Sequence, residues 1–132
     1  MITATVAISA LSTVVGCGSS PAEIPAGEDL KGTWDQTGAG FEGGVPSIWE
    51  DQILVITTAE DQGFAGYKEY TKGDGKTVQE TINSVISPTG VILITDRNGY
   101  FWGTLPNGVI SGQYAGAVED DSTAMNMVLT RQ

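Results

Sequence analysis

The chain has 132 residues, a length that suits one domain with a single hydrophobic core. It has one cysteine and no histidine, which excludes an internal disulfide, a Ser-His-Asp triad and any histidine metal ligand. Sixteen acidic residues against six basic ones give a formal net charge of −10, which repels phosphate backbones and disfavours nucleic acid as a partner.

The N-terminal stretch predicts export. Residues 2–16 are uncharged and mostly small or apolar, about the length of a secretion-signal core and too short to span a bilayer. The sequence Val14-Val15-Gly16-Cys17 resembles the lipobox of bacterial lipoproteins. That resemblance implies a diacylglycerol on the Cys17 thiol and a third acyl chain on the new amino terminus, and two or more chains anchor a protein stably.

One feature departs from that pattern, since such signals begin with Lys or Arg and the first basic residue here is Lys31. The alternative is a signal without lipid, or an apolar tail in which Cys17 is an ordinary residue. Residue 18 is Gly and not Asp, which by the same resemblance implies sorting to the outer membrane of a host with two membranes. We therefore expect an exported lipoprotein, anchored through Cys17 in the bacterial cell envelope, periplasmic or at the surface.

Three segments follow from this interpretation. Residues 1–17 form the signal, disordered or helical, and residues 18–29 form a flexible tether because Ser, Pro and Gly dominate them. Residues 30–132 form the folded domain, in which β-rich runs alternate with turn residues. The expected strands begin at Gly32 and then cover residues 51–58, 64–72, 77–86, 91–95, 100–105, 109–117 and 123–131.

Short connections between these strands predict antiparallel neighbours. Eight such strands favour an all-β fold, an eight-stranded antiparallel up-and-down β-barrel, with an open sandwich as the alternative. The longest connection, residues 38–47, is rich in glycine and is expected to arch over one mouth of the barrel. Met125, Met127 and Leu129 alternate along the last strand, which favours a place in the core.

The first and last strands carry a motif. Gly32-x-Trp34 at the start and Arg131 near the end resemble the calycin superfamily of lipocalins, fatty-acid-binding proteins and avidins. The resemblance implies that the guanidinium of Arg131 stacks on the indole of Trp34 and closes the barrel. It implies nothing about a ligand.

Two stretches also resemble avidins, residues 32–38 (GTWDQTG) and residues 111–117 (SGQYAGA). The polar contacts that this family makes to biotin are not matched: Gln36 and Gly40 stand where the family has Asn and Ser, and Lys68 stands where it has Tyr. Because a polar site that loses its partners loses affinity steeply, biotin binding is not expected.

Aromatic side chains are the candidates for a ligand-binding interior, namely Tyr67, Trp102 and Tyr114. Glycines 103, 112 and 116 either permit tight packing of a neighbouring aromatic ring or leave room for a ligand. The acidic residues at 50–51, 60–61 and 119–121 fall at turns or strand ends, where solvation explains them, so no catalytic pair, metal site or cofactor is predicted.

Two functions remain. The chain is either a binding protein for a small apolar ligand or a protein partner, or a structural or interaction module of the envelope with a solid core and no ligand. A connected internal void would favour the first, and an exposed aromatic patch would favour the second. An enzyme that works mainly by shape is a third and weaker alternative. The oligomeric state is unknown from the sequence.

Overall fold

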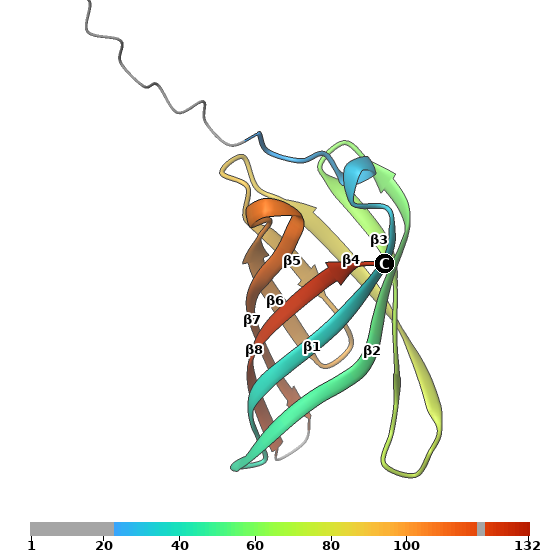
Figure 1. The fold of residues 1–132 in the computed structure, drawn as a ribbon, viewed down its shortest axis with the longest axis vertical. Helices are drawn as coiled ribbons and strands as arrows, with labels where there is room; N and C mark the ends of the chain where they lie inside the picture. Colours follow the sequence, from blue (N-terminus) through green and yellow to red (C-terminus); the bar gives the residue numbers. More distant parts are fainter. Residues whose placement is uncertain (1–22, 119–120) are drawn as a thin grey trace, which may run out of the picture.

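The computed structural model describes residues 23–118 and 121–132, and these form a closed barrel of eight antiparallel strands in chain order (Figure 1). The strands are β1 (Gly32–Glu42), β2 (Val45–Glu60), β3 (Gly63–Thr71), β4 (Thr77–Ile86), β5 (Ile92–Thr95), β6 (Gly99–Thr104), β7 (Val109–Val118) and β8 (Asp121–Arg131). Two short 3-10 helices, η1 (Gly27–Leu30) and η2 (Pro106–Gly108), flank them. The predicted up-and-down barrel is thus confirmed, and the open sandwich is excluded because β1 pairs with β8.

Buried and exposed side chains alternate along the strands, and the buried ones form the core of the barrel. In β8 the side chains of Met125, Met127 and Leu129 are buried, while their neighbours in the sequence are exposed. The same alternation in β4 buries Ile82 and Ile86. Because successive side chains of a strand point to opposite faces, one set fills the barrel and the other meets solvent.

The expected loop over residues 38–47 is wrong. Strand β1 continues to Glu42 and β2 begins at Val45, so the connection is a tight turn at Gly43 and Gly44, which both have positive φ. Gly40 belongs to the strand instead, because a Cβ atom there would lie 2.0 Å from the carbonyl oxygen of Ala124. Glycine here permits close approach of β8 and does not mark a loop.

The other glycines of the interior make room for aromatic rings. A Cβ atom on Gly103 or Gly112 would come within 2.6 or 2.8 Å of the Phe101 ring, and one on Gly116 within 2.9 Å of the Tyr114 ring. These glycines therefore serve tight packing, the first of the two alternatives that the sequence leaves open.

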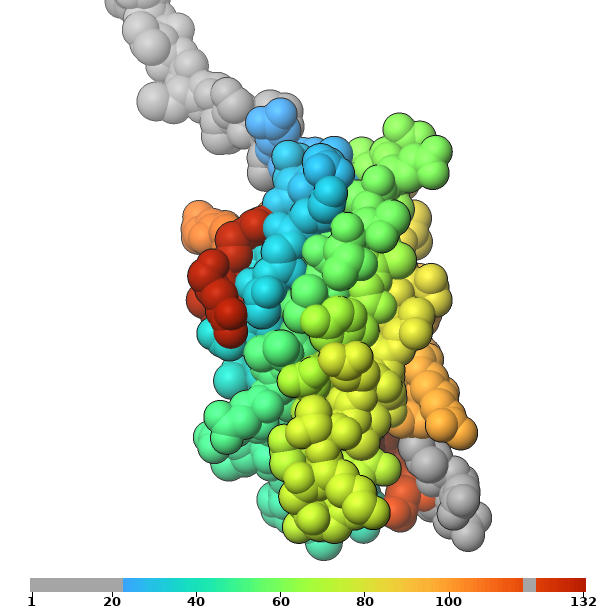
Figure 2. Space-filling model, turned by 90° about the vertical axis from the view of Figure 1, so that its right-hand side faces the viewer, coloured from blue at the N-terminus to red at the C-terminus, as the bar shows by residue number. Residues whose placement is uncertain are grey.

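The barrel has one short strand. β5 has four residues and pairs with β4 only through Asn83–Ile86. The remaining part of β4, from Thr77 to Ile82, pairs with β3 but has no strand on its other side among the described residues. The hairpin of β3 and β4 extends beyond the barrel wall at the lower right of Figure 1, and its tip is seen in yellow-green at the lower end of Figure 2.

Candidate functional site

One end of the barrel is closed by the predicted pair of Trp34 and Arg131. The guanidinium carbon of Arg131 lies 4.6 Å from the centre of the Trp34 ring, which is 1% exposed. Arg131 Nη1 donates a hydrogen bond of 2.8 Å to the carbonyl of Lys31, and Nη2 donates one to the carbonyl of Asp29. Trp34 Nε1 donates to the carbonyl of Leu30 at 2.9 Å. The two side chains thus tie η1 to the seam between β1 and β8.

Gly32 completes this end. Its φ of 131° is one that residues with a side chain rarely adopt, and a Cβ atom there would stand 3.3 Å from Arg131 Nη1. A glycine at this position therefore lets the chain turn from η1 into β1 beneath the guanidinium. The contacts to the barrel begin before the expected boundary at residue 30, since the Gly27 amide donates to the carbonyl of Asp61 at 2.8 Å.

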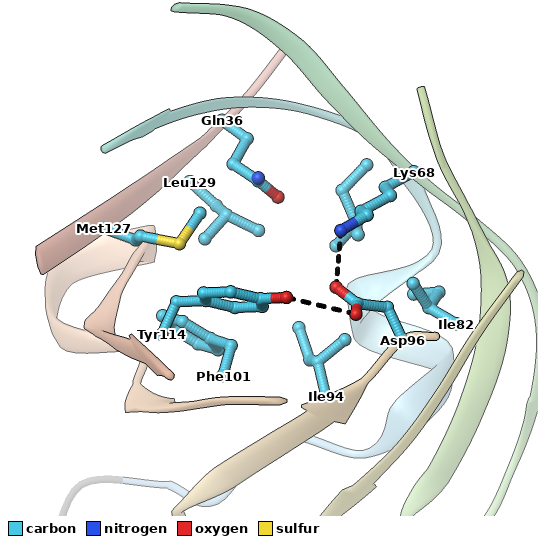
Figure 3. Close-up of a pocket in the computed structure, with 10 residues that line it drawn as sticks. Gln36, Lys68, Ile82, Ile94, Asp96, Phe101, Tyr114, Met127 and Leu129 are labelled. Carbon is cyan, nitrogen blue, oxygen red and sulfur yellow. Dashed lines mark hydrogen bonds and ion pairs between the residues drawn. The ribbon is translucent and has the colours of Figure 1, made fainter. Parts of the chain in front are cut away.

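The interior is almost filled. The cavity at its centre has a volume of about 20 Å³, room for about one water molecule, and its lining mixes apolar side chains with Gln36, Lys68, Asp96 and Tyr114 (Figure 3). Ligand pockets for small molecules are typically more than ten times larger, roughly 300–1,000 Å³. No connected void for an apolar ligand exists inside the barrel as the structure describes it.

A charged cluster lies beside this cavity. Lys68 Nζ on β3 lies 2.5 Å from Asp96 Oδ2 and 3.1 Å from Glu80 Oε2 on β4, and the three side chains are only 11%, 6% and 9% exposed. Glu80 Oε1 accepts hydrogen bonds from Tyr70 and Asn98 at 2.7 and 3.2 Å, while Oε2 accepts no hydrogen bond and contacts Lys68 through the ion pair alone. One ammonium thus faces two carboxylates, and the cluster keeps one negative charge.

Asp96 anchors the turn between β5 and β6. Its Oδ1 atom accepts hydrogen bonds from the amides of Asn98 and Gly99 at 2.7 and 2.9 Å and from the Tyr114 hydroxyl at 3.2 Å, as Figure 3 shows in part. The cluster therefore joins β3, β4, this turn and β7. It does so where β4 and β5 share no ladder, so that side-chain contacts hold the barrel together at that point.

The surroundings keep both tyrosines of this cluster neutral. Burial raises the pKa of Tyr70 to about 12, and the hydrogen bond to Glu80 adds to the effect. Burial likewise raises the pKa of Tyr114 well above 10, with Asp96 adding to it through its charge and its hydrogen bond. Neither hydroxyl is poised as a base, and both act as donors to the carboxylates.

The structure does not bring the three predicted ligand residues together. Tyr114 is 6% exposed and points into the barrel, where its ring and that of Trp49 form a T-shaped pair with their centres 5.3 Å apart. Tyr67 pairs with Val55 and Thr81 on the outer face, and Trp102, 37% exposed, is on the outer face as well. The expected common lining by Tyr67, Trp102 and Tyr114 is therefore wrong, because the inward side chains next to the first two are Lys68 and Phe101.

The residues that sequence reasoning missed are Lys68, Glu80 and Asp96. A signal for two of them was present. Glu80 lies on the same face of β4 as Val78, Ile82 and Ile86, and the alternation of that strand places this face inside the barrel. In β3 the corresponding inward-facing positions are Phe64, Gly66 and Lys68. Two opposite charges at core positions of adjacent strands predict a buried ion pair once the register is known, and here Lys68 pairs directly with Glu80.

The outer face carries a second feature, which we name the uncharged face. It consists of residues 37, 39 and 41 of β1, 100, 102 and 104 of β6, 111, 113 and 115 of β7, and 124, 126 and 128 of β8, and none of them is charged. Phe41, Tyr100, Trp102 and Val128 belong to the large apolar side chains that are exposed to solvent. Between Phe41 and Trp102 a hollow of about 460 Å³ is floored by small side chains such as Ala115 and Ala124.

Several sequence predictions fall outside this structure. Cys17, its lipobox and residues 119–120 lie outside the described residues. Within residues 23–118 and 121–132 no group of three or more acidic or cysteine side chains is placed to hold a metal ion. No helix in this part of the chain has the length and apolar character needed to cross a membrane.

Comparison with known proteins supports the fold alone. No protein family and no curated protein matches the chain. Among solved structures it is similar to a protein of unknown function from Bacteroides ovatus, with a TM-score of 0.55 and 14% identity. The match covers 78% of this chain and 42% of that one, so the chain spans less than half the length of this structural relative.

Proposed function

We propose that this chain is an exported, lipid-anchored interaction module of the bacterial envelope, a calycin-like barrel that binds a protein partner through its uncharged face. The observation that carries the proposal is the filled interior. A cavity of about 20 Å³ leaves no room for an apolar ligand, so the outer surface is the part of the barrel that can bind.

The charge distribution supports this face as the contact. The chain has a formal net charge of −10, yet the twelve side chains of the uncharged face, drawn from four neighbouring strands, carry no charge. Charged residues are depleted in the centres of protein interfaces, whereas aromatic ones are enriched. Trp102 and Tyr100, whose ring centres lie 5.3 Å apart, match that composition. Trp102 and Phe41 also line a hollow that a partner's side chain can enter.

The anchor rests on the sequence. Val14-Val15-Gly16-Cys17 has the lipobox pattern, and residues 18–22 with the first described residues provide a tether to the barrel. The mass of the mature chain tests this part. We expect a chain that begins at Cys17 with two or three acyl groups, whereas a free thiol with residues 1–16 attached would overturn the anchor and leave the interaction surface untouched.

Photocrosslinking in the native host tests the surface. A photoreactive residue at Gln113, in the centre of the uncharged face, should give one discrete crosslinked protein, and the matched residue at Thr57, exposed on β2, should not. Adding Ala124→Asp should abolish the crosslink from position 113, because a carboxylate buried in an apolar contact has no partner. Equal products at both positions, a crosslink to a second copy only, or a retained small molecule in native mass spectrometry would overturn the proposal.

A further inference from the structure

We propose that the open edge of β4 binds an extended acidic segment of a partner protein, which adds to the sheet as an extra strand. This site is formed by β4, across the barrel from the strands β6, β7, β8 and β1 that carry the uncharged face. It goes beyond the function proposed above. It is carried by two independent observations, an unpaired backbone edge and the placement of the free cationic side chains.

The hydrogen-bond register shows which backbone groups are open. The Lys72 amide donates to the carbonyl of Lys76 at 2.9 Å, and the Ile86 amide donates to the carbonyl of Gln62 at 2.8 Å. In antiparallel pairs the residues alternate between those that exchange hydrogen bonds with the partner and those that point away. Even-numbered residues of β4 therefore bond to β3.

The amides and carbonyls of Thr77, Gln79 and Thr81 consequently point to the opposite edge. Asn83, next in this series, is paired with Thr95 of β5, which agrees with the assignment. No strand of the described residues pairs with the other three. An exposed edge of this kind is a template for an added strand.

A cleft of about 500 Å³ runs along this edge. It is lined by Gln79, Glu80 and Thr81 of β4, by Thr95, Asp96 and Arg97 at and after the end of β5, and by Lys72 in the connection between β3 and β4. The end of β5 and the turn that follows it form the wall opposite β4. The cleft therefore occupies the place where β5 would pair with β4 if it were longer. Its volume suits a short extended segment.

The charge of the cleft selects the partner. Lys31 and Lys76 form ion pairs with Glu28 and Asp74, Lys68 is held in the buried cluster, and Arg131 is stacked on Trp34. Among the described residues, Lys72 and Arg97 are the cationic side chains without such a contact, and both border the cleft. On a chain of net charge −10 these two mark a local site for carboxylates.

The negative groups nearby do not cancel this preference. The cleft is lined by two anions, Glu80 and Asp96, and by two cations, Lys72 and Arg97. Lys68, which does not line the cleft, forms ion pairs with both carboxylates and neutralises them in part, whereas Lys72 and Arg97 form no ion pair with the described residues. Glu69 belongs to β3, on the side of β4 away from the cleft, and there accepts a hydrogen bond from Gln79 Nε2 at 2.8 Å. The added strand should therefore place acidic side chains beside Lys72 and Arg97, with main-chain hydrogen bonds to β4.

Peptide binding to the full-length chain tests the inference. The probe is a capped, fluorescent peptide of alternating glutamate and valine, long enough to span Thr77–Ile82, and its controls are the lysine-valine peptide and a glutamate-valine peptide N-methylated at alternate residues. We expect the two controls to bind at least about tenfold more weakly, because each loses charge attraction or edge hydrogen bonds. Binding should also weaken as salt is raised.

Two sets of variants locate the site. Gln79→Pro removes an amide that points to the cleft and leaves the β3 bonds intact, so it should abolish binding, whereas Gln79→Ala should retain it. Lys72→Gln and Arg97→Gln should each weaken binding several-fold, and the matched control Lys31→Gln, beside η1, should not. If Gln79→Pro fails to fold, amide hydrogen exchange on the unmodified chain decides: the peptide should protect Thr77, Gln79 and Thr81.

Three results would overturn the inference. These are equal binding of the glutamate and lysine peptides, protection that maps to β6–β8, and binding that survives both N-methylation and Gln79→Pro. None of these results bears on the partner proposed for the uncharged face, because the two sites are separate. Ala124→Asp, which should abolish the crosslink from position 113, is expected to leave peptide binding unchanged. Conversely, loss of the crosslink from position 113 does not affect the peptide result.

Discussion

The barrel is joined in two different ways at two of its seams. Between β1 and β8 nine consecutive residue pairs run from Trp34–Arg131 to Glu42–Thr123, and the stacked guanidinium closes their end. Between β4 and β5 only four residue pairs form, from Asn83 to Ile86. Beyond them, the ion pairs of Lys68 with Glu80 and Asp96 connect the two sides of the seam. A ladder leaves no backbone group open, whereas side-chain contacts leave the edge of β4 available. The seam with the weaker ladder is therefore the one that can accept a partner.

Loss of Trp34 should damage the β1–β8 seam most. Trp34→Ala removes a side chain that is 1% exposed and leaves the Leu30 carbonyl without its donor, so we expect a loss of about 3–5 kcal/mol in the free energy of unfolding. Trp34→Phe keeps most of the ring and should lose less than half of that. Urea denaturation followed by far-UV circular dichroism measures both. Equal losses in the two variants would mean that the hydrogen bond to Leu30, and not the packing, holds this end.

The cluster is the matching target at the β4–β5 seam. Lys68→Met leaves the carboxylates of Glu80 and Asp96 buried without their cation, and we expect a loss of about 3 kcal/mol at neutral pH. The loss should be smaller in the combined variant Lys68→Met/Glu80→Gln, because one of the two uncompensated charges is then removed. The same denaturation experiment measures both variants. A loss that is no smaller in the combined variant would show that Lys68 contributes only its aliphatic chain.

The β1–β8 seam could be predicted from the sequence, and the β4–β5 seam could not. Gly32, Trp34 and Arg131 carry a local pattern that fixes the ends of two strands, and alternation identified the core positions of β8. The inner face of β3 was missed because Tyr67 is a more obvious core candidate than Lys68 by hydrophobicity. Only the pairing of Lys68 with Glu80 shows why a lysine occupies the interior, and pairing is a long-range property.

The start of β2 was missed for a similar reason. The register of β1 with β2 shifts between Gln36 and Gly38, and the chain near Glu50 and Asp51 departs from regular alternation, with positive φ at Asp51. A bulge of this kind reverses which side chains face inward, so that alternation read from residue 51 onward cannot be extended back to Val45. The glycines of β1 then resembled a loop, although β8 packs directly against them.

Alkaline pH should weaken the β4–β5 seam through its tyrosines. The folded-state pKa of Tyr70 is raised from 10.0 to about 12, so the neutral hydroxyl stabilises the fold below pH 10 and this contribution is lost as the pH rises toward 12. The slope for one such group is at most about 1.4 kcal/mol per pH unit. Denaturation above pH 10 should therefore show a shallower decline for Tyr70→Phe than for the unmodified chain. Tyr100→Phe, on the uncharged face, is the control and should keep the full slope; identical slopes in all three chains would contradict the assignment.

The smallest effect is expected where the β1–β8 seam meets solvent. Arg131→Lys keeps the charge but loses the planar group that stacks on Trp34 and donates to two carbonyls, those of Lys31 and Asp29. Because Arg131 is itself exposed, we expect a loss of only about 1 kcal/mol in the free energy of unfolding. The loss should shrink in a Trp34→Phe background if stacking on the larger indole is its cause, and a double-mutant cycle measures this coupling. An unchanged loss there would assign the contribution of Arg131 to its hydrogen bonds to η1, and would make η1, more than the indole, the element that holds this seam closed.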